Sequence, residues 1–272
     1  MIVKNCDDIF NEIGNSAFLR FLNLAHKYNK AVPIQEIYDD WINGNKKMSE
    51  LYNRWEKSVQ DGNPDYSVYN DLFYLEDAFG SWKGFSRRYM MMLRKYINGN
   101  NSEIDKSVVK SVIDLGCGCG YSTIGLKSLF PDATIYGTNL VNTLQWYIDV
   151  DVFKPFKDIF PVAEQDTLSL DSVDLVFASE FFEHLDKPID LLLGLIQKYK
   201  PKYFVFANTF TKMSLGHFYM YSYNGSEYDG KAISRLFNKC LRDNGYVKVN
   251  TGFFNNRPQL YRLADKTSKG LF

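Results

Sequence analysis

The sequence predicts an α/β protein with a seven-stranded, mostly parallel β-sheet, helices on both faces, and an additional helical region at the N-terminus. Three observations support this prediction. Short apolar runs alternate with helical segments from about residue 108 onward, the pattern of parallel strands joined by crossover helices. One apolar run, 112–115, leads through a glycine-rich turn into a helical segment. The last two runs, 246–251 and 259–263, have no helix between them, so one of them should be antiparallel.

The first 98 residues show apolar side chains at near-helical spacing and no alternating strand pattern. Pro33 suits the first turn of a helix, and the polar stretch 98–102 is typical of a linker. We therefore expect a helical cap or substrate region over 1–98 and a second domain over 99–272. The helices predicted in the first region span about 10–25, 33–42, 48–59, 66–79 and 81–97, the last two separated by Gly80.

The strands and helices of the second domain are predicted from the spacing of its apolar residues. Strands are expected at 108–115, 134–137, 159–163, 173–178, 203–207, 246–251 and 259–263. Helices are expected at 121–130, 142–152, 188–198 and 226–244.

The amino-acid composition limits the kinds of binding partner and site that can be expected. Lysine plus arginine equals aspartate plus glutamate at 32 each, so net charge favours neither nucleic acid nor an anionic membrane. The four cysteines form no Cys-x-x-Cys pair, which argues against a zinc knuckle or a redox motif. No apolar run reaches the length of a membrane span and the N-terminus lacks an apolar signal core, so a cytoplasmic location is expected.

The strand–turn–helix at 112–126 carries the clearest chemical signal. Its glycines follow the pattern Gly116-x-Gly118-x-Gly120, which fails the six-residue spacing of dinucleotide-binding turns. Asp114, two residues before the first glycine, would repel a pyrophosphate but would suit a cation. The segment resembles motif I of the class I S-adenosylmethionine-dependent methyltransferases, whose Rossmann-like fold likewise ends in two consecutive strands, one of them antiparallel. The resemblance covers roughly 100–265.

The resemblance implies a cofactor, S-adenosylmethionine, whose methionyl part and ribose would lie on the glycine turn. Asn139 stands where such enzymes usually carry an acid that binds the ribose hydroxyls, and Asn can still bond to them without charge. Asp166 resembles the acid that binds the adenine amino group, although a solvated loop carboxylate is the alternative. The cofactor residues implied in this way are Asp114, Gly116, Cys117, Gly118, Asn139, Leu140, Asp166, Thr167, Ser179 and Glu180.

The exit of the fourth strand, Ser179-Glu-Phe-Phe-Glu-His-Leu185, resembles a segment common in small-molecule methyltransferases of this class. If it is helical, Glu180, Glu183 and His184 share one face. They could simply edge the adenosine pocket, or they could act in catalysis together with His217. The Glu-x-x-Glu-His spacing also resembles that of small-RNA 2′-O-methyltransferases, which implies a magnesium or manganese site formed by Glu180, Glu183, His184 and His217.

The leading hypothesis is an enzyme that transfers a methyl group from S-adenosylmethionine to a small-molecule acceptor by in-line displacement. Two alternatives remain open. One is a metal-assisted 2′-O-methyltransferase acting on RNA or a nucleotide. The other is a methyltransferase fold that binds without catalysing, to which the neutral Asn139 lends some weight.

Overall fold

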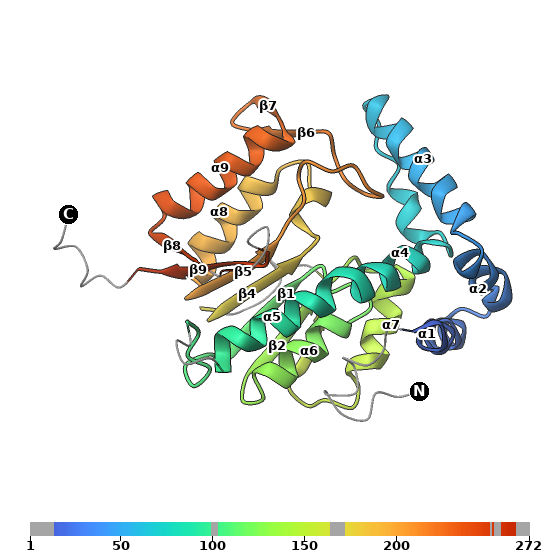
Figure 1. Cartoon of the computed structure of the whole chain (residues 1–272), viewed down its shortest axis with the longest axis horizontal. Coiled ribbons are helices and arrows are strands. Elements are labelled where there is room, and N and C mark those ends of the chain that lie inside the picture. Colours follow the sequence, from blue (N-terminus) through green and yellow to red (C-terminus); the bar gives the residue numbers. More distant parts are fainter. Residues whose placement is uncertain (1–13, 99–102, 164–171, 251, 253–256, 265–272) are drawn as a thin grey trace.

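The computed structural model describes residues 14–98, 103–163, 172–250, 252 and 257–264, and contains a central seven-stranded sheet (Figure 1). The strand order is β3-β2-β1-β4-β5-β9-β8, in which β9 is antiparallel to both neighbours and the other pairs are parallel. The predicted fold class is confirmed, including the antiparallel strand at the end. The strands are β1 (Ser111–Leu115), β2 (Thr134–Thr138), β3 (Ile159–Val162), β4 (Leu175–Ser179), β5 (Tyr203–Ala207), β8 (Tyr246–Val249) and β9 (Gln259–Leu263).

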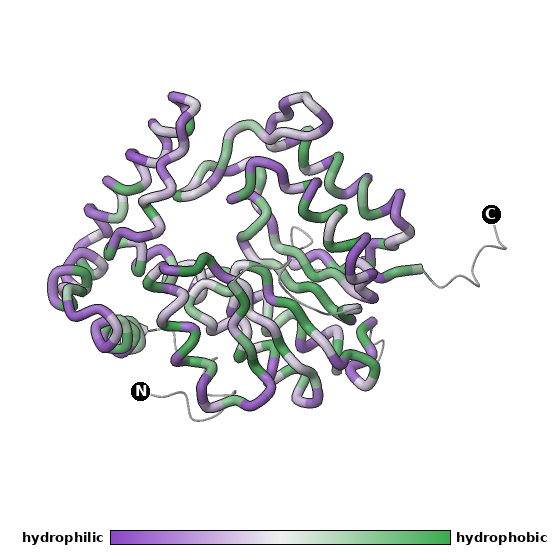
Figure 2. The backbone as a smooth tube through the Cα atoms, turned by 180° about the vertical axis from the view of Figure 1, so that it is seen from behind, coloured by the Kyte–Doolittle hydropathy of each residue, from purple (hydrophilic) through white to green (hydrophobic). Residues whose placement is uncertain are grey.

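Helices cover both faces of the sheet because its strands are apolar on both sides. In β1, Val112 packs into one core cluster and Ile113 into the other. The first face carries α5 (Arg87–Asn98), α6 (Tyr121–Leu129) and α7 (Leu144–Phe153). The second carries α8 (Pro188–Tyr199) and α9 (Gly230–Asp243). Figure 2 shows the central strands as mostly hydrophobic and the outer helices as mixed. Parallel strands buried on both faces read as continuous apolar runs, which made them predictable.

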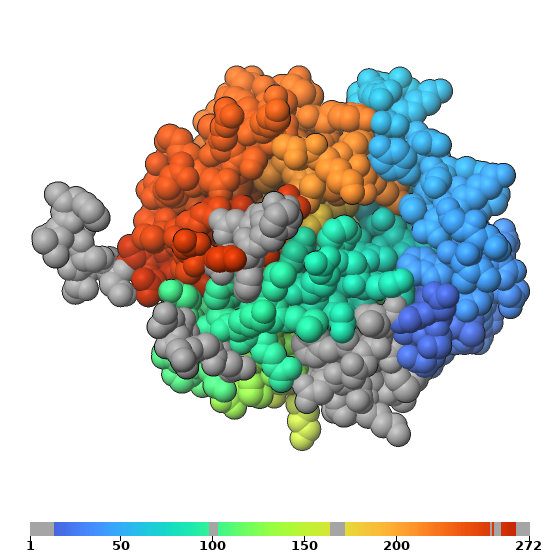
Figure 3. All heavy atoms as spheres, viewed as in Figure 1, coloured from blue at the N-terminus to red at the C-terminus, as the bar shows by residue number. Residues whose placement is uncertain are grey.

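The N-terminal helices lie beside the carboxyl ends of β1 and β4, and Figure 3 shows the first of them, up to about residue 60, in blue along one side of the molecule. Their elements are α1 (Asn15–Tyr28), α2 (Ile34–Ile42), α3 (Lys46–Gln60), a 3₁₀ turn η2 (Tyr66–Asn70), α4 (Tyr74–Ser81) and a π turn η3 (Trp82–Ser86). One core cluster runs from Phe18 in α1 to Val205 in β5, so these helices share a core with the sheet.

Two predictions for this region were wrong. The single helix expected at 66–79 is interrupted, because the chain becomes extended at Asp71, whose side chain accepts a hydrogen bond from the amide of Phe73 (3.1 Å). Such a local bond competes with helix propagation. Gly80 does not separate two helices, since α4 continues through η3 into α5.

A two-stranded hairpin replaces the first turn of the helix predicted at 226–244. It consists of β6 (Met220–Tyr223) and β7 (Ser226–Asp229), joined by Asn224-Gly225, both with positive φ. Asn-Gly is the preferred pair for a two-residue hairpin turn, so the signal was present in the sequence. Helix α9 starts only at Gly230, where Asp229 caps it by accepting from the amide of Ala232 (2.7 Å).

Within the described residues, no helix has both the length and the apolar character needed to cross a bilayer. Cys117, Cys119 and Cys240 are free thiols, and all three are buried.

Glu76 in α4 gives the fold a measurable pH dependence. Its side chain is buried, and neither carboxyl oxygen has a hydrogen-bond partner among the described residues. Burial, followed by the charge of Asp40, raises its pKa to about 8. The folded state therefore holds a proton that the unfolded state releases above pH 4–5, and stability falls as pH rises toward 8. We expect Glu76→Gln to flatten this decline.

Chemical denaturation of both proteins at pH 5, 7 and 8.5 checks this expectation. The gain in unfolding free energy from Glu76→Gln should be largest at pH 8.5. An equal effect of the substitution at all three values would contradict the assigned pKa shift.

Candidate functional site

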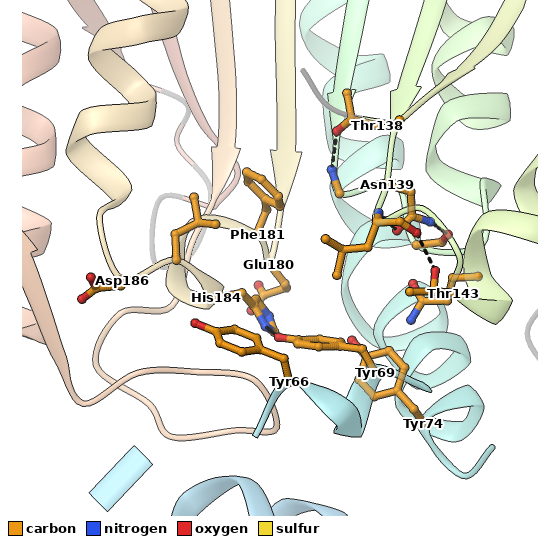
Figure 4. A pocket seen from close by; sticks show the side chains of 16 residues that line it. Tyr66, Tyr69, Tyr74, Thr138, Asn139, Thr143, Glu180, Phe181, His184 and Asp186 are labelled. Carbon is orange, nitrogen blue, oxygen red and sulfur yellow. Dashed lines mark hydrogen bonds between the residues drawn. The ribbon is translucent and has the colours of Figure 1, made fainter. Parts of the chain in front are cut away.

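Two adjoining cavities lie at the carboxyl ends of β1, β2 and β4, where open α/β sheets bind ligands. The larger has a volume of about 390 Å³ and reaches from Asn139 to Asp186 (Figure 4). The smaller, of about 100 Å³, lies between the glycine turn and helix α4. The residues that line both are Tyr74, Gly116, Gly118, Gln145, Glu180 and His184.

The glycine turn after β1 has a backbone that few other residues could adopt. Gly116, Gly118 and Gly120 have φ of 63°, 60° and 81°. A Cβ on Gly116 would overlap the ring of Phe181, which lines the larger cavity, and one on Gly120 would lie 2.6 Å from Phe153. The turn therefore keeps bare backbone against both cavities, as the motif predicts. Cys117 and Cys119, which alternate with these glycines, are buried and line the smaller cavity.

Asp114 is buried at the end of β1 and lines the smaller cavity. Its Oδ2 accepts hydrogen bonds from the hydroxyls of Ser122 (2.6 Å) and Thr123 (2.7 Å) at the start of α6. Burial nevertheless raises its pKa to about 7, outweighing the lowering by those two bonds. A cation in the cavity would favour the charged form.

Asn139 holds the glycine turn in place. Its Nδ2 donates to the carbonyl of Gly118 and to Oδ2 of Asp149 (3.0 Å), and its Oδ1 accepts from the amide of Leu140 (2.9 Å). Both ends of the amide are thus engaged by the protein itself. Leu140 lines the larger cavity and is mostly exposed. Asp166 and Thr167 lie outside the described residues.

Asp149 in α7 was missed by sequence reasoning. It is fully buried, and burial raises its pKa to about 7. Besides the amide of Asn139, the thiol of Cys117 donates to it (3.4 Å). The sequence shows only an acid in the segment 144–153, and this does not reveal that its partners are Cys117 in the glycine turn and Asn139 after β2.

Glu180 ends β4 with a left-handed backbone, φ 50°, and is held by side chains from two distant segments. The hydroxyl of Tyr89 in α5 donates to its Oε1 (3.2 Å), and that of Thr209 donates to its Oε2 (3.1 Å). Arg257 donates in turn to Thr209 (2.8 Å). The neighbouring hydroxyls of Ser179 and Ser86 are 2.9 Å apart. A strained residue held this firmly is typical of a functional site.

The helix considered for 180–184 is not formed, because only Phe182–His184 makes a 3₁₀ turn after the left-handed Glu180. Glu180, Glu183 and His217 still meet, with potential ligand atoms all within 4.8 Å of one another. His184, the other predicted ligand, is not part of that set. Its ring packs edge-on against His217, with ring centroids 4.7 Å apart.

Glu183 and His217 leave lone pairs free for a ligand. Glu183 is fully buried, its Oε1 accepts from the amide of Thr209 (2.6 Å), and its Oε2 has no partner among the described residues. Burial and the charge of Glu180 raise its pKa well above the usual range. His217 Nδ1 donates to the carbonyl of Lys212 (2.7 Å), and burial lowers its pKa to about 4, so its neutral ring keeps Nε2 as an acceptor. Glu183 would have to lose its proton to bind an ion, and two carboxylates with a neutral imidazole are then ligands that suit magnesium or manganese.

His184 faces the larger cavity together with a tyrosine from the N-terminal region (Figure 4). Its Nδ1 lies 3.2 Å from the hydroxyl of Tyr69. Burial and the nearby His217 lower the pKa of His184 well below the usual range, so the ring is neutral at pH 7. Gly216 permits this pairing, since a Cβ there would overlap both His184 and Tyr69.

The two cavities have a one-sided charge. Among the described residues that line them are the carboxylates of Asp77, Asp114, Glu180 and Asp186, whereas no lysine or arginine lines either one. This arrangement suits a cationic ligand and is unfavourable for a diphosphate. Of these four, Asp114 and Glu180 were predicted from the sequence.

Comparison with known proteins identifies the family and the fold. A family described as methyltransferase domain matches residues 87–266. An O-methyltransferase family protein from Burkholderia thailandensis is 12% identical, with a TM-score of 0.55 over 83% of this chain and 70% of that one. Human N-acetylserotonin methyltransferase, in complex with SAM, is 15% identical, with a TM-score of 0.50 over 84% of this chain and 70% of that one. These two likenesses show the fold alone. No curated protein matches the chain.

Proposed function

The chain belongs to the methyltransferase domain family and is an S-adenosylmethionine-dependent methyltransferase, and we propose that its acceptor is a small planar molecule, neutral or cationic. The observation that carries the proposal is the joint lining of the larger cavity. It combines the glycine turn with the aromatic rings of Tyr66, Tyr69, Tyr74 and Phe181 and with carboxylates. Rings of this kind favour flat ligands, and the one-sided charge disfavours anionic ones.

In this proposal the cofactor lies across the glycine turn. Its nucleoside would occupy the larger cavity near Leu140 and Thr143, and its methionyl part the smaller cavity beside Asp114. Gly116, Cys117 and Gly118 would offer backbone groups to it, and Asn139 would act through the turn that it holds. The N-terminal region, 1–98, would form a cap over both ligands, and residues 99–272 would form the methyltransferase domain.

Methyl transfer needs alignment more than acid–base chemistry. When bound, S-adenosylmethionine would supply an activated methyl group, which an acceptor lone pair would displace from sulfur to leave a neutral thioether. If the attacking group is a hydroxyl, its proton has to be removed. His184 is neutral and reaches the cavity, and when Nδ1–H donates to Tyr69 its Nε2 can accept that proton. A hydroxyl acceptor is also suggested by the similar fold of the O-methyltransferase family protein from Burkholderia thailandensis.

Calorimetry with S-adenosylmethionine tests the cofactor part of the proposal. We expect saturable binding that weakens at least tenfold in Asp114→Ala and no binding of NAD. Methylation of a panel of phenols and phenolic amines, compared with carboxylated analogues, then tests the acceptor class. Tight cofactor binding without transfer to any acceptor would favour the non-catalytic alternative, and preference for the carboxylated analogues would contradict the charge argument.

A second candidate is a metal-assisted methyltransferase for a nucleotide or RNA hydroxyl. It is favoured by Oε2 of Glu183 and Nε2 of His217, for which the described part of the chain provides no hydrogen-bond partner. Glu180, Glu183 and His217 would hold the ion, which when bound would lower the pKa of the acceptor hydroxyl. Loss of transfer with a chelator and in His217→Ala, restored by manganese only in the unmodified protein, would support this candidate. Transfer that is insensitive to chelator would leave the first one.

A further inference from the structure

Asp77 is a carboxylate of the smaller cavity that the functions discussed above leave unused. Helix α4 carries it one turn after Tyr74, and both side chains reach the cavity wall. Leu75 and Glu76 of the same helix are buried but line neither cavity. The N-terminal helices therefore contribute one acid, Asp77, to the wall of the smaller cavity, whose other wall includes the glycine turn.

The surroundings of Asp77 lack a compensating charge. Among the described residues its carboxylate makes no hydrogen bond and no ion pair, and the charged group acting on it is the carboxylate of Glu180. Burial and that like charge raise its pKa to about 7. Asp114 lines the same cavity, and no lysine or arginine does so in the described part of the chain. Asp77 is half-buried, and leaving a charged carboxylate there without a partner is costly, so a ligand that brings a positive charge would complete this arrangement.

We propose that Asp77 binds the α-ammonium group of the cofactor's methionyl part, an inference that rests on the proposed cofactor site. The cofactor carries two cationic centres, the sulfonium and the ammonium. The ammonium offers three N–H donors to a carboxylate, whereas the sulfonium offers none, so a carboxylate recognises the ammonium more strongly. The small volume beside the glycine turn, about 100 Å³, suits an amino-acid group rather than a nucleoside.

This contact would connect the N-terminal helices to the cofactor. Glu180 is anchored to α5 through Tyr89 and to the β5 exit through Thr209, so its carboxylate is fixed. Asp77 lies on a separate helix, α4, and an ammonium group bound by both carboxylates would bridge Asp77 and Glu180. Binding of the cofactor would then hold α4, and with it Tyr74, against the cavity that receives the acceptor.

The test measures the affinity of Asp77→Asn for three ligands by calorimetry. S-adenosylmethionine has both cationic centres, S-adenosylhomocysteine has only the ammonium, and 5′-methylthioadenosine has neither. We expect the first two to bind roughly ten- to a hundredfold more weakly, as for loss of a hydrogen bond between charged groups, and the third to bind unchanged. Glu76→Gln is the matched control, an adjacent acid of α4 that does not line the cavity, and it should bind all three normally.

Each other outcome overturns the inference in a distinct way. Weakening of S-adenosylmethionine alone would assign Asp77 to the sulfonium. Equal weakening of all three ligands with an unchanged circular dichroism spectrum would show that Asp77 does not recognise the ammonium group. If the spectrum changes, Asp77→Ser takes the place of Asp77→Asn in the same test. Unchanged affinities would show that Asp77 does not contact the cofactor. Failure of the unmodified protein to bind any of the three would instead refute the proposed cofactor site itself.

Discussion

Gly116→Ala is expected to lower the affinity for S-adenosylmethionine at least thirtyfold without unfolding the protein. Two effects of the added methyl group combine. The residue would have to keep a φ of 63°, which costs a side chain about 1–3 kcal/mol. The methyl group would also overlap the ring of Phe181, with a second ring atom, Cε2, only 3.1 Å away, and would push that ring into the larger cavity. Calorimetric titration of the purified variant measures the loss.

Gly118→Ala is the matched control for this prediction. Its φ is nearly the same, 60°, but the nearest atom to its added Cβ is Oε1 of Gln145 at 3.8 Å, an ordinary contact. Both variants should therefore have the same backbone strain, whereas only Gly116→Ala should displace Phe181. Equal affinities in the two variants would show that the position of Phe181 has no part in binding. Normal affinity in Gly116→Ala would place the cofactor away from the glycine turn.

The sheet could be predicted because its signals are local. Strands such as 175–179 and 203–207 are buried on both faces and therefore appear as apolar runs. The glycine turn and the acid before it were equally readable, since their chemistry depends on consecutive residues. Asn139 was predicted to lie near the cofactor, but its bonds join the glycine turn 21 residues earlier to a helix residue ten positions further on, and neither pairing can be seen in the sequence.

The N-terminal part of the site could not be predicted, for a different reason. Helical periodicity shows which residues of 66–98 face a core, but not which strand end they meet. Asp77, Tyr69 and Tyr89 contribute to the cavities through contacts with residues about a hundred positions away. The left-handed backbone of Glu180 was also unforeseen, and it replaced a helical face by a cluster in which His217, not His184, joins the two glutamates.

Trp55→Ala is expected to lower the free energy of unfolding by about 3–5 kcal/mol. Trp55 lies in α3 and is fully buried, with its ring 5.6 Å from that of Phe218 and 6.2 Å from that of Tyr69 (centroid distances). Its Nε1 donates to the carbonyl of His217 (2.7 Å). One side chain thus joins α3 to the segment after β5 that carries a candidate site residue. Urea denaturation followed by circular dichroism measures the loss.

Trp55→Phe separates the two contributions of this side chain. It keeps an aromatic ring among Tyr69 and Phe218 but leaves the His217 carbonyl without its donor, so we expect a smaller loss, about 1–3 kcal/mol. Met91→Ala, at an exposed position of α5, should change stability by less than about 0.5 kcal/mol. A loss below about 1 kcal/mol in Trp55→Ala would contradict the docking of α3 on this segment. If the expected loss is found, the N-terminal helices are part of the folded core that positions His217, and so cannot be removed without changing the site.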